Sequence, residues 1–357
     1  MLTLQDKLQD EFSDLGALYL RDNKIGLFDL CIRFGKTRTA IKVFEKLLKK
    51  KPNILICYPD NKIKESWEGD LALMNYNANI TLTNTTSLGK YENNKYDMFV
   101  LDEIHSLSEN EINISKQIIR NSKHVLGLSG SISDQTRTDL IFNFNMKTIK
   151  KYSLEEGIRD GIIANYQITI HYVELDNITK KANAKGVLKS EKQLYSDYTH
   201  VINNKKGDKK FLYINRDRIL KSSISKIRKV KELLKEKKRT LVFTGLTKTA
   251  ESLGIGSYHS KSKDKTYFDK FQKGLTDSLA LAETGKLGVT YSKLDRVILL
   301  SFTGNEETTS QIVFRSILLD YTSKVADIHI ICSTEPAEIK KLNNTLAMVN
   351  KQKIKNL

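Results

Sequence analysis

The sequence of 357 residues has few of the residues that interrupt or cross-link a chain, with three prolines and three cysteines. Scarce proline together with 39% apolar residues argues against disorder and favours a folded protein. The cysteines, Cys31, Cys57 and Cys332, are far apart and form no Cys-x-x-Cys pair. This spacing argues against a disulfide framework or a zinc site and fits a reducing cytoplasm.

Long apolar runs are also missing. Runs such as Ile54–Cys57 have the length of a strand, whereas a helix that crosses a bilayer needs about 20 apolar residues. The start of the chain, residues 1–10, lacks the basic stretch and apolar core of a signal peptide, so none is expected. We therefore expect no membrane partner.

Acidic residues are too few to balance the basic ones, and the formal net charge is +17. Residues 180–239 hold much of this imbalance, with 20 lysines and arginines against 6 acidic residues. A concentrated positive segment is typical of a protein that contacts a phosphate backbone, although a solvated lysine-rich surface is the alternative.

Residues 1–150 alternate between segments of strand and helix character, which is typical of a parallel sheet with helices on both faces. Each predicted strand ends at a polar or glycine-containing turn. The polar side chains therefore collect at the carboxyl edge of the sheet, where ligands bind in open α/β folds. The predicted strands are 27–32, 53–58, 79–83, 96–101 and 124–129.

Two of these strand ends carry residues suited to nucleotide hydrolysis. Gly35, Lys36 and Thr37 stand at a strand-to-helix turn, where backbone N–H groups and a lysine hold phosphates and the hydroxyl reaches Mg²⁺. Asp102 and Glu103 directly follow an apolar strand, where the aspartate completes the metal shell and the glutamate activates water. Together the two patterns predict an ATP–Mg²⁺ site.

The rest of the chain divides into a basic inter-lobe segment, 151–238, and a second α/β unit, 239–357, after the first unit of 1–150. Within the basic segment, 203–210 is expected to be an exposed loop, and apolar spacing predicts a helix over 224–234. Further predicted strands are 166–175, 239–244, 278–282, 296–301 and 326–332, with a helix over 308–320 and a lysine-rich helix at the end.

With these residues in place, the chain resembles superfamily 2 helicases and translocases of the DExH type over nearly its whole length. The phrase at 156–163 is similar to the inter-lobe segment of phage and XPB-like DNA helicases. The resemblance implies two RecA-like P-loop NTPase lobes, each with a mainly parallel sheet flanked by helices. The matching motifs are 35–37 (I), 54–59 with Trp67 (Ia), 83–88, 102–105 (II), 128–131 (III), 242–244 and 258–260 (IV), 287–290 (V) and 311–315 (VI).

The resemblance also implies a role for individual residues. The residues expected to act in hydrolysis are Lys36, Asp102, Glu103, Gln311 and Arg315. Those expected to bind the nucleotide are Gly35, Lys36, Thr37, Arg38, Gly288 and one glutamine, Gln5 or Gln9, at the adenine base. Thr37 and Asp102 are expected to hold Mg²⁺.

Other residues are expected to couple the nucleotide to nucleic acid or to contact it. The coupling residues are His105, Ser129 and Ser131, although an ordinary polar turn explains the two serines equally well. Trp67 is expected to serve packing rather than base stacking. The residues expected at the nucleic-acid backbone are Thr86, Thr290, Lys205, Lys206, Lys209 and Lys210.

Three positions depart from the family pattern. Leu30 stands where the phosphate-loop pattern has its first glycine, and Phe314 replaces the glycine of motif VI. Leu318 replaces the second arginine of motif VI, which in the family stabilises charge at the γ-phosphate. Rapid hydrolysis is therefore in doubt, and Arg315 is the remaining arginine in register.

The sequence favours an ATP-dependent helicase or translocase that hydrolyses ATP between two lobes to move along or remodel DNA. DNA is favoured over RNA, with backbone contacts that tolerate every base. Protein partners in replication, recombination or repair and a bacterial or phage-infected cytoplasm fit this interpretation. The alternatives are an ATP-gated clamp or annealing factor, and a DNA-binding subunit of a larger complex that hydrolyses ATP poorly.

Overall fold

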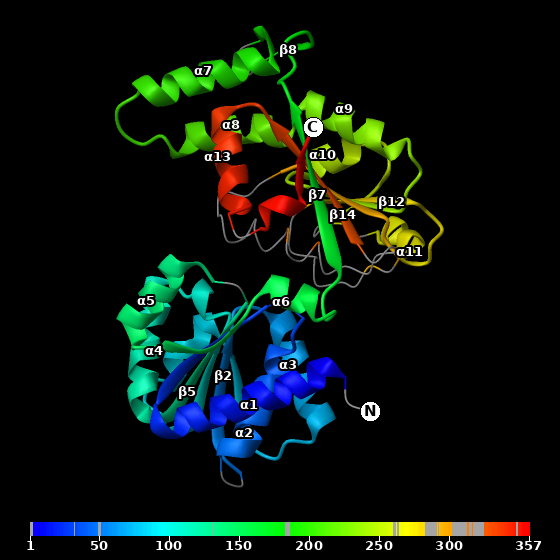
Figure 1. Cartoon of the computed structure of the whole chain (residues 1–357). Helices are drawn as coiled ribbons and strands as arrows, with labels where there is room; N and C mark the ends of the chain where they lie inside the picture. The colour runs from blue at the N-terminus through cyan, green and yellow to red at the C-terminus, as the bar shows by residue number, and fades with distance from the viewer. Residues whose placement is uncertain are drawn as a thin grey trace. The chain divides into compact units, whose positions relative to one another are not determined.

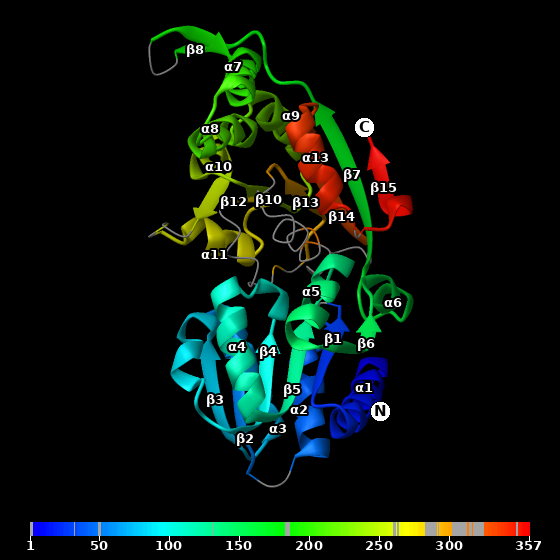
Figure 2. The same cartoon turned by 90° about the vertical axis from the view of Figure 1, so that its left-hand side faces the viewer.

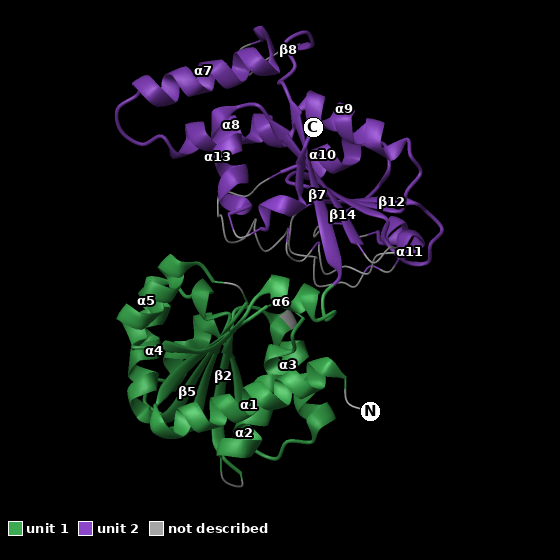
Figure 3. Ribbon diagram, viewed as in Figure 1, with its two compact units in different colours: residues 1–163 green, residues 164–357 purple. Residues whose placement is uncertain are grey.

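Contacts between residues divide the chain into two compact units, residues 1–163 and 164–357 (Figure 3). Each unit is built around its own parallel sheet. The computed structural model describes the chain except for residues 1, 2, 32, 49, 50, 131, 183–185, 260, 261, 263, 283–290, 292, 302–312, 314, 315, 317–324 and 348.

The first unit contains a six-stranded sheet in the order β3-β2-β4-β5-β1-β6, and all neighbouring strands run parallel. Helices lie on both faces of this sheet (Figure 1). Its elements are α1 (Leu4–Asp22), β1 (Ile25–Leu30), α2 (Lys36–Leu47), β2 (Asn53–Tyr58), α3 (Asn61–Met74), β3 (Asn79–Asn84), η1 (Thr85–Tyr91), β4 (Tyr96–Asp102), η2 (Ile104–Ser106), α4 (Glu109–Asn121), β5 (Ser122–Ser129), α5 (Asp134–Phe144), β6 (Lys147–Tyr152) and α6 (Leu154–Arg159).

Most helices of this unit begin with a side chain that caps their first N–H groups. Ser108 and Glu111 form a capping box at the start of α4, and Ser153 and Glu156 form one at the start of α6. Helix α2 differs, because its N-cap residue is Gly35, which has no side chain to cap with. The first N–H groups of α2 therefore receive no hydrogen bond from a capping side chain, and a helix start of this kind is suited to bind an anion.

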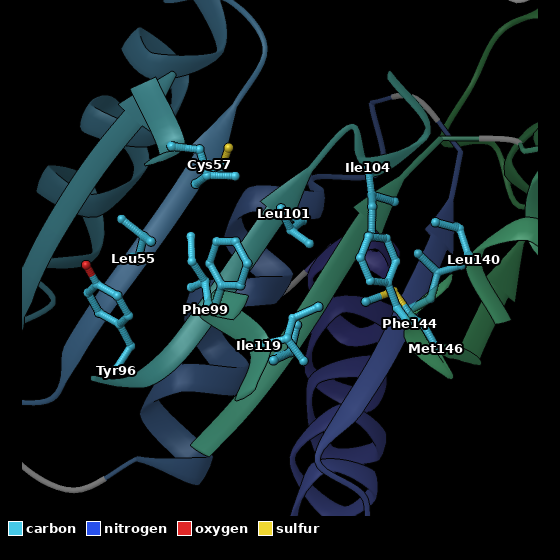
Figure 4. Close-up of a cluster of buried hydrophobic side chains, with 14 of the residues drawn as sticks. Leu55, Cys57, Tyr96, Phe99, Leu101, Ile104, Ile119, Leu140, Phe144 and Met146 are labelled. Carbon is cyan, nitrogen blue, oxygen red and sulfur yellow. The ribbon is translucent and has the colours of Figure 1, made fainter. Parts of the chain in front are cut away.

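One face of the first sheet packs on α4 and α5 through a cluster of buried side chains (Figure 4). Leu101 and Ile104 belong to this cluster and stand on either side of Asp102 and Glu103. Burying a leucine or isoleucine side chain contributes about 1.5–3 kcal/mol. The core therefore fixes the chain on both sides of the acidic pair.

The second unit contains a seven-stranded sheet in the order β11-β12-β10-β13-β14-β7-β15, again with parallel neighbours (Figure 2). Helices α9 and α10 bury apolar side chains against it. Its elements are β7 (Asn165–Val173), β8 (Lys180–Ala182), β9 (Leu188–Ser190), α7 (Glu191–Asn204), α8 (Lys210–Lys221), α9 (Ile224–Leu234), β10 (Thr240–Thr244), α10 (Thr247–Ser252), β11 (Gly256–His259), α11 (Thr266–Gln272), β12 (Ser278–Ala282), β13 (Arg296–Leu299), β14 (Val325–Ser333), α13 (Pro336–Thr345), η4 (Lys351–Lys353) and β15 (Ile354–Asn356).

Helices α7 and α8 form a hairpin that extends from the body of the second unit (Figures 1 and 2). A small core of Leu175, Tyr195 and Leu220 packs at its base. The Glu191 carboxylate accepts hydrogen bonds there from the backbone N–H of Ile224 and from the Ser223 hydroxyl, at 2.5 and 3.2 Å. The hairpin is therefore fixed at its base.

The predicted strands are present in both units, with shifted ends. Strand β1 ends at Leu30 rather than at residue 32, because Cys31 already belongs to the loop before α2. The predicted loop over 203–210 is shorter than expected, since α7 runs to Asn204 and α8 begins at Lys210. The helix predicted over 308–320 lies outside the described residues, apart from two positions.

The predicted division of the chain into 1–150, 151–238 and 239–357 stays a prediction. In the structure, β6 runs across residue 150, and β7 from the basic segment pairs with β14 inside the second sheet. Within the described part of the chain, no helix has the length and apolar character needed to cross a membrane.

Candidate nucleotide site

The two motifs that predict nucleotide hydrolysis meet at the carboxyl edge of the first sheet. Lys36 begins α2 directly after the loop from β1, and Glu103 follows the last residue of β4. The Lys36 ammonium donates a hydrogen bond to Glu103 Oε1 at 2.9 Å, although 67 positions separate the two residues. Both side chains retain some exposure, 14% and 24%, so the ion pair remains open to a ligand.

The loop that precedes α2 is held by two glutamine side chains from α1. Gln9 Nε2 donates to the Phe34 carbonyl at 2.7 Å, and Gln5 Nε2 donates to the carbonyls of Arg33 and Phe34 at 2.8 and 2.9 Å. Gly35 has φ +90°, and a Cβ there would lie 2.3 Å from Gln9 Nε2. Glycine is therefore required here both by its backbone conformation and by the close approach of Gln9.

Aromatic packing attaches the same loop to the end of the first unit. The Phe34 ring stacks on Phe12 with centroids 5.1 Å apart and lies 4.9 Å from the ring of Tyr152. The Cys31 N–H donates to the Tyr152 carbonyl at 2.8 Å. Gly157 in α6 also packs close to Cys31, since a Cβ on this glycine would lie 3.3 Å from the sulfur. The segment 156–163 thus lies, through Gly157, against the loop that precedes α2.

Asp102 is a buried carboxylate, 6% exposed, whose two oxygens each accept a hydrogen bond. Trp67 Nε1 donates to Oδ2 and the Glu103 N–H donates to Oδ1, both at 2.9 Å. Burial and the charge of Glu103 raise the pKa of Asp102 to about 6, although Lys36 and the two hydrogen bonds work in the other direction. The adjacent carboxylates of Asp102 and Glu103 together favour the binding of a cation.

Glu103 is held in a backbone conformation that is rare for a side chain of its kind, with φ 49°. The N–H and hydroxyl of Ser106 both donate to the Glu103 carbonyl, at 2.9 and 2.8 Å. Ile104 is buried in the core on the following position. The surrounding contacts therefore offset a strain of about 1–3 kcal/mol and fix the direction of the glutamate.

His105 links this acidic pair to the neighbouring strand β5. Its Nδ1 lies 2.6 Å from Ser129 Oγ and 3.5 Å from Glu103 Oε2. Ser129 is fully buried at the end of β5, which lies between β1 and β4 in the sheet. The structure therefore brings together His105 and Ser129, which the sequence assigned to coupling, while their coupling role stays a prediction.

Electrostatics at Lys36 favour the charged ammonium. Burial works against the charge, but Glu103 and Asp102 outweigh it and raise the pKa of the lysine. Lys36 therefore stays protonated at neutral pH and is suited to bind phosphate oxygens.

The other predicted residues of the first unit have different surroundings. Thr37 is half-buried in the first turn of α2, beside Lys36. Arg38 is partly exposed and pairs with Asp70 of α3 at 2.9 Å. Thr86 is exposed after β3, and its hydroxyl donates to the Asn84 side chain at 3.0 Å. Their predicted contacts with nucleotide, metal and nucleic acid stay predictions.

The predicted residues of the second unit fall into two groups. Lys205, Lys206 and Lys210 are exposed at the α7–α8 turn, and Lys209 is half-buried there. Those outside the described residues, together with Ser131 of the first unit, are Gly288, Thr290, Gln311 and Arg315.

The structure also shows site contacts that the sequence did not indicate. Trp67 is buried, as expected for packing, but it also donates the hydrogen bond that orients Asp102. Asp29 of β1 is buried and pairs with Arg137 of α5 at 3.0 Å. An acidic residue inside the apolar run of β1 is the sequence signal that could have indicated such a partner.

The two parallel sheets flanked by helices define the fold, because each unit has the RecA-like architecture that is also found in solved helicase structures. This finding confirms the predicted fold. No protein-family model matches the chain, and no curated protein matches it.

Individual solved structures resemble the chain over nearly its whole length. The Hef helicase domain of Pyrococcus furiosus is 13% identical, with a TM-score of 0.59, and the match covers 96% of this chain and 99% of that one. The ATP-dependent type ISP restriction-modification enzyme LlaBIII, bound to DNA, is 12% identical with a TM-score of 0.59, covering 98% of this chain and 31% of that one. Dbp5 of S. cerevisiae, bound to RNA and ADP BeF3, is 11% identical with a TM-score of 0.55, covering 98% and 89%. At these identities the likeness shows the fold alone.

Proposed function

We propose that the protein is an ATP-dependent helicase or translocase of the DExH type that moves along or remodels DNA. The observation that carries the proposal is the ion pair between Lys36 and Glu103 at the carboxyl edge of the first sheet. A phosphate-binding lysine and an acidic strand end from distant parts of the chain are placed together where α/β folds bind ligands. The choice of DNA rests on the sequence pattern at 102–105 and 156–163, because the similar folds include one bound to DNA and one bound to RNA.

The donor set fits Mg²⁺. Mg²⁺ is bound through one or two carboxylates together with phosphate oxygens and waters. Asp102 offers a buried carboxylate, and Thr37 adds a hydroxyl. When bound, the ion would neutralise charge that develops on the phosphates.

In this proposal the nucleotide changes the partner of Lys36. The ammonium binds phosphate oxygens in place of Glu103 Oε1, and the released carboxylate then accepts a hydrogen bond from the attacking water. His105, next to both Glu103 and Ser129, would report this change to β5. Gln311 and Arg315 are also proposed to act in hydrolysis, on the basis of the motif VI pattern alone.

Nucleic acid is proposed as the track, with the basic α7–α8 turn and Thr86 as backbone contacts. Lys205, Lys206 and Lys210 are exposed, so they are free to neutralise phosphates, and each such contact releases counterions. Contacts of this kind tolerate every base, as movement along a strand requires. Partners in DNA replication, recombination or repair in a bacterial or phage-infected cell fit this activity.

The test is steady-state ATP hydrolysis with no nucleic acid and with single-stranded DNA, duplex DNA, branched DNA or RNA. Stimulation by DNA that is lost in Glu103→Gln is the expected result. This variant keeps the size of the side chain and removes its charge, so it isolates the role in activating water. No turnover with any ligand would contradict the motor.

Leu318 in motif VI favours a second candidate, an ATP-gated clamp or a DNA-binding subunit that hydrolyses slowly. A clamp would bind DNA more tightly with ATP but separate no strands. A subunit would bind DNA equally with and without nucleotide. Leu318→Arg distinguishes the candidates, because strand separation that appears together with faster turnover in this variant indicates a motor that lacks only this charge.

A further inference from the structure

Helix α8 presents an exposed stripe that combines an aromatic ring with positive charges. Lys210, Phe211, Ile214 and Arg218, which we call the α8 stripe, recur at helical spacing and are all exposed. Phe211 is 70% exposed and Ile214 is 42% exposed. From Lys210 to Arg218 the stripe runs about 12 Å along the helix.

Phe211 is the most exposed of the large apolar side chains of α8. On another face of α8, Arg216 lies over the rings of Tyr195 and Tyr213, at 5.6 and 5.4 Å from their centroids. Near the body, Leu220 is buried and Asp217 pairs with Lys221 at 2.7 Å. Arg216, Asp217 and Leu220 thus have partners within the protein, whereas the side chains of the stripe are exposed.

The charge around the stripe indicates the chemistry of its partner. Residues 205–218 contain six lysines and arginines against two aspartates. Protein interfaces are depleted of lysine at their centres, so a protein partner fits this surface poorly. A phosphate backbone fits the positive charge, and a base fits the exposed ring, because every base has a face on which an aromatic side chain can stack.

We propose that the α8 stripe binds single-stranded DNA, with Phe211 stacking on an unpaired base while Lys210 and Arg218 contact the backbone. The proposal rests on the proposed function for the presence of DNA, and it adds that the track at this site is unpaired. Bases inside a duplex are already stacked on one another. The ring therefore selects a single strand, and Ile214 extends the apolar surface on which the base lies.

The test is equilibrium binding of the full chain, without nucleotide, to a fluorescent single-stranded DNA, measured by anisotropy. Removing an aromatic stacking partner costs about 1–3 kcal/mol per base. We therefore expect Phe211→Ala to weaken binding about 5- to 150-fold. Phe211→Trp should bind at least as well as the wild type. Phe211→Leu should bind as poorly as Phe211→Ala, because leucine keeps apolar area but has no ring.

Phe142 supplies the matched control, since it is 89% exposed on α5 of the first unit. Phe142→Ala should leave binding unchanged. A second control is a DNA strand of equal length that has abasic sites. It should bind the wild type as weakly as normal DNA binds Phe211→Ala, and it should be insensitive to that substitution.

The outcomes separate the stripe from the motor. Wild-type binding that Phe211→Ala leaves unchanged, or that Phe211→Leu preserves, would overturn the stacking proposal while DNA-stimulated hydrolysis still stood. Loss of binding in Phe211→Ala with no ATP turnover in the wild type would support the stripe and refute the motor. A Phe211-dependent preference for single-stranded RNA would overturn the assignment to DNA.

Discussion

Each sheet has a lysine–glutamate ion pair near the carboxyl ends of its strands, and the two pairs differ in their surroundings. In the first unit, Lys36 and Glu103 are partly exposed and have further capacity for partners. In the second unit, Lys226 of α9 pairs with Glu338 of α13, and their side chains are only 1% and 4% exposed. One pair lies open to solvent and the other is sealed.

Both partners of the sealed pair also form hydrogen bonds with the backbone. Lys226 Nζ donates to the Leu300 carbonyl at 3.1 Å, and Glu338 Oε2 accepts from the Ser333 N–H at 2.8 Å. These contacts tie α9 and α13 to the ends of β13 and β14. The comparison shows that position at a sheet edge does not make an ion pair a ligand site, because only the open pair can exchange its partner.

The largest expected effect is on stability, at the sealed pair. Lys226→Met leaves the Glu338 charge buried without its partner, so the free energy of unfolding should fall by about 3–5 kcal/mol. Urea denaturation measures the loss. Lys229→Met is the control, because Lys229 pairs with Glu232 on the exposed surface of the same helix, where a pair contributes about 0–1 kcal/mol. The double variant Lys226→Met/Glu338→Leu should recover part of the loss. A loss below about 1 kcal/mol in Lys226→Met would refute the contrast.

Substitution at the open pair should lower the rate of ATP hydrolysis more than the stability of the protein. Lys36→Ala removes the cation that is proposed to bind the phosphates and should lower the ATP hydrolysis rate about 10²- to 10³-fold. Its free energy of unfolding should fall by less than that of Lys226→Met, because water reaches Glu103. Lys42→Ala is the matched control on α2, since Lys42 pairs with Asp10 and should leave turnover unchanged. Equal losses of turnover in both variants would argue against a specific role for Lys36.

The carboxylates at the two ends of β4 should contribute to the free energy of unfolding with opposite dependence on pH. The pKa of Asp102 is raised to about 6, so the folded state binds this proton more tightly than the unfolded state, and stability falls as pH rises from about 4 to 6. Asp97, at the other end of the strand, is half-buried, and although partial burial works in the other direction, hydrogen bonds from Lys123 and the Asn53 N–H hold its pKa below the usual value of 3.8. Its contribution is instead lost as pH falls through that lower pKa.

Urea denaturation of the nucleotide-free protein between pH 3 and 7 measures both contributions, each on the order of 1 kcal/mol per unit of pKa shift. Relative to the wild type, Asp102→Asn should become more stable as pH rises. Asp97→Asn should become less stable over the same change. If the two variants gave parallel pH profiles, the two ends of β4 would not differ as described.

Much of the nucleotide site was predictable from local patterns. The apolar run before Asp102 and the turn at Gly35 each mark a strand end, and parallel strands place their carboxyl ends at one edge. The approach of Lys36 to Glu103 follows from that rule without knowledge of the strand order. The details of orientation depend on contacts between distant residues, such as Trp67 with Asp102, and a single sequence does not encode their geometry locally.

Lys226 shows where the sequence interpretation missed a signal. The helix over 224–234 was predicted from apolar residues spaced among lysines, which suggests that all the lysines are solvated. Lys226 is instead buried, because it lies on the same face as Val230 and Leu233. The spacing that places Lys226 on the apolar face was visible in the sequence. Its partner Glu338 lies 112 positions away, however, and only the packing of α9 beside α13 reveals this ion pair.

The smallest expected effect concerns Arg38, which the family pattern assigns to the nucleotide although the structure pairs it with Asp70. The Arg38 side chain is 46% exposed, so Arg38→Ala should change the free energy of unfolding by less than about 1 kcal/mol. Asp70→Asn removes the pair but keeps Arg38, and this variant separates the two roles when binding of an ATP analogue is measured by calorimetry. If Arg38 contacts the nucleotide, Arg38→Ala weakens binding whereas Asp70→Asn does not, because the freed guanidinium keeps its charge beside the first turn of α2. If Arg38 only ties α2 to α3, both variants shift the affinity equally, and the open part of the site is then confined to Lys36 and the acidic pair.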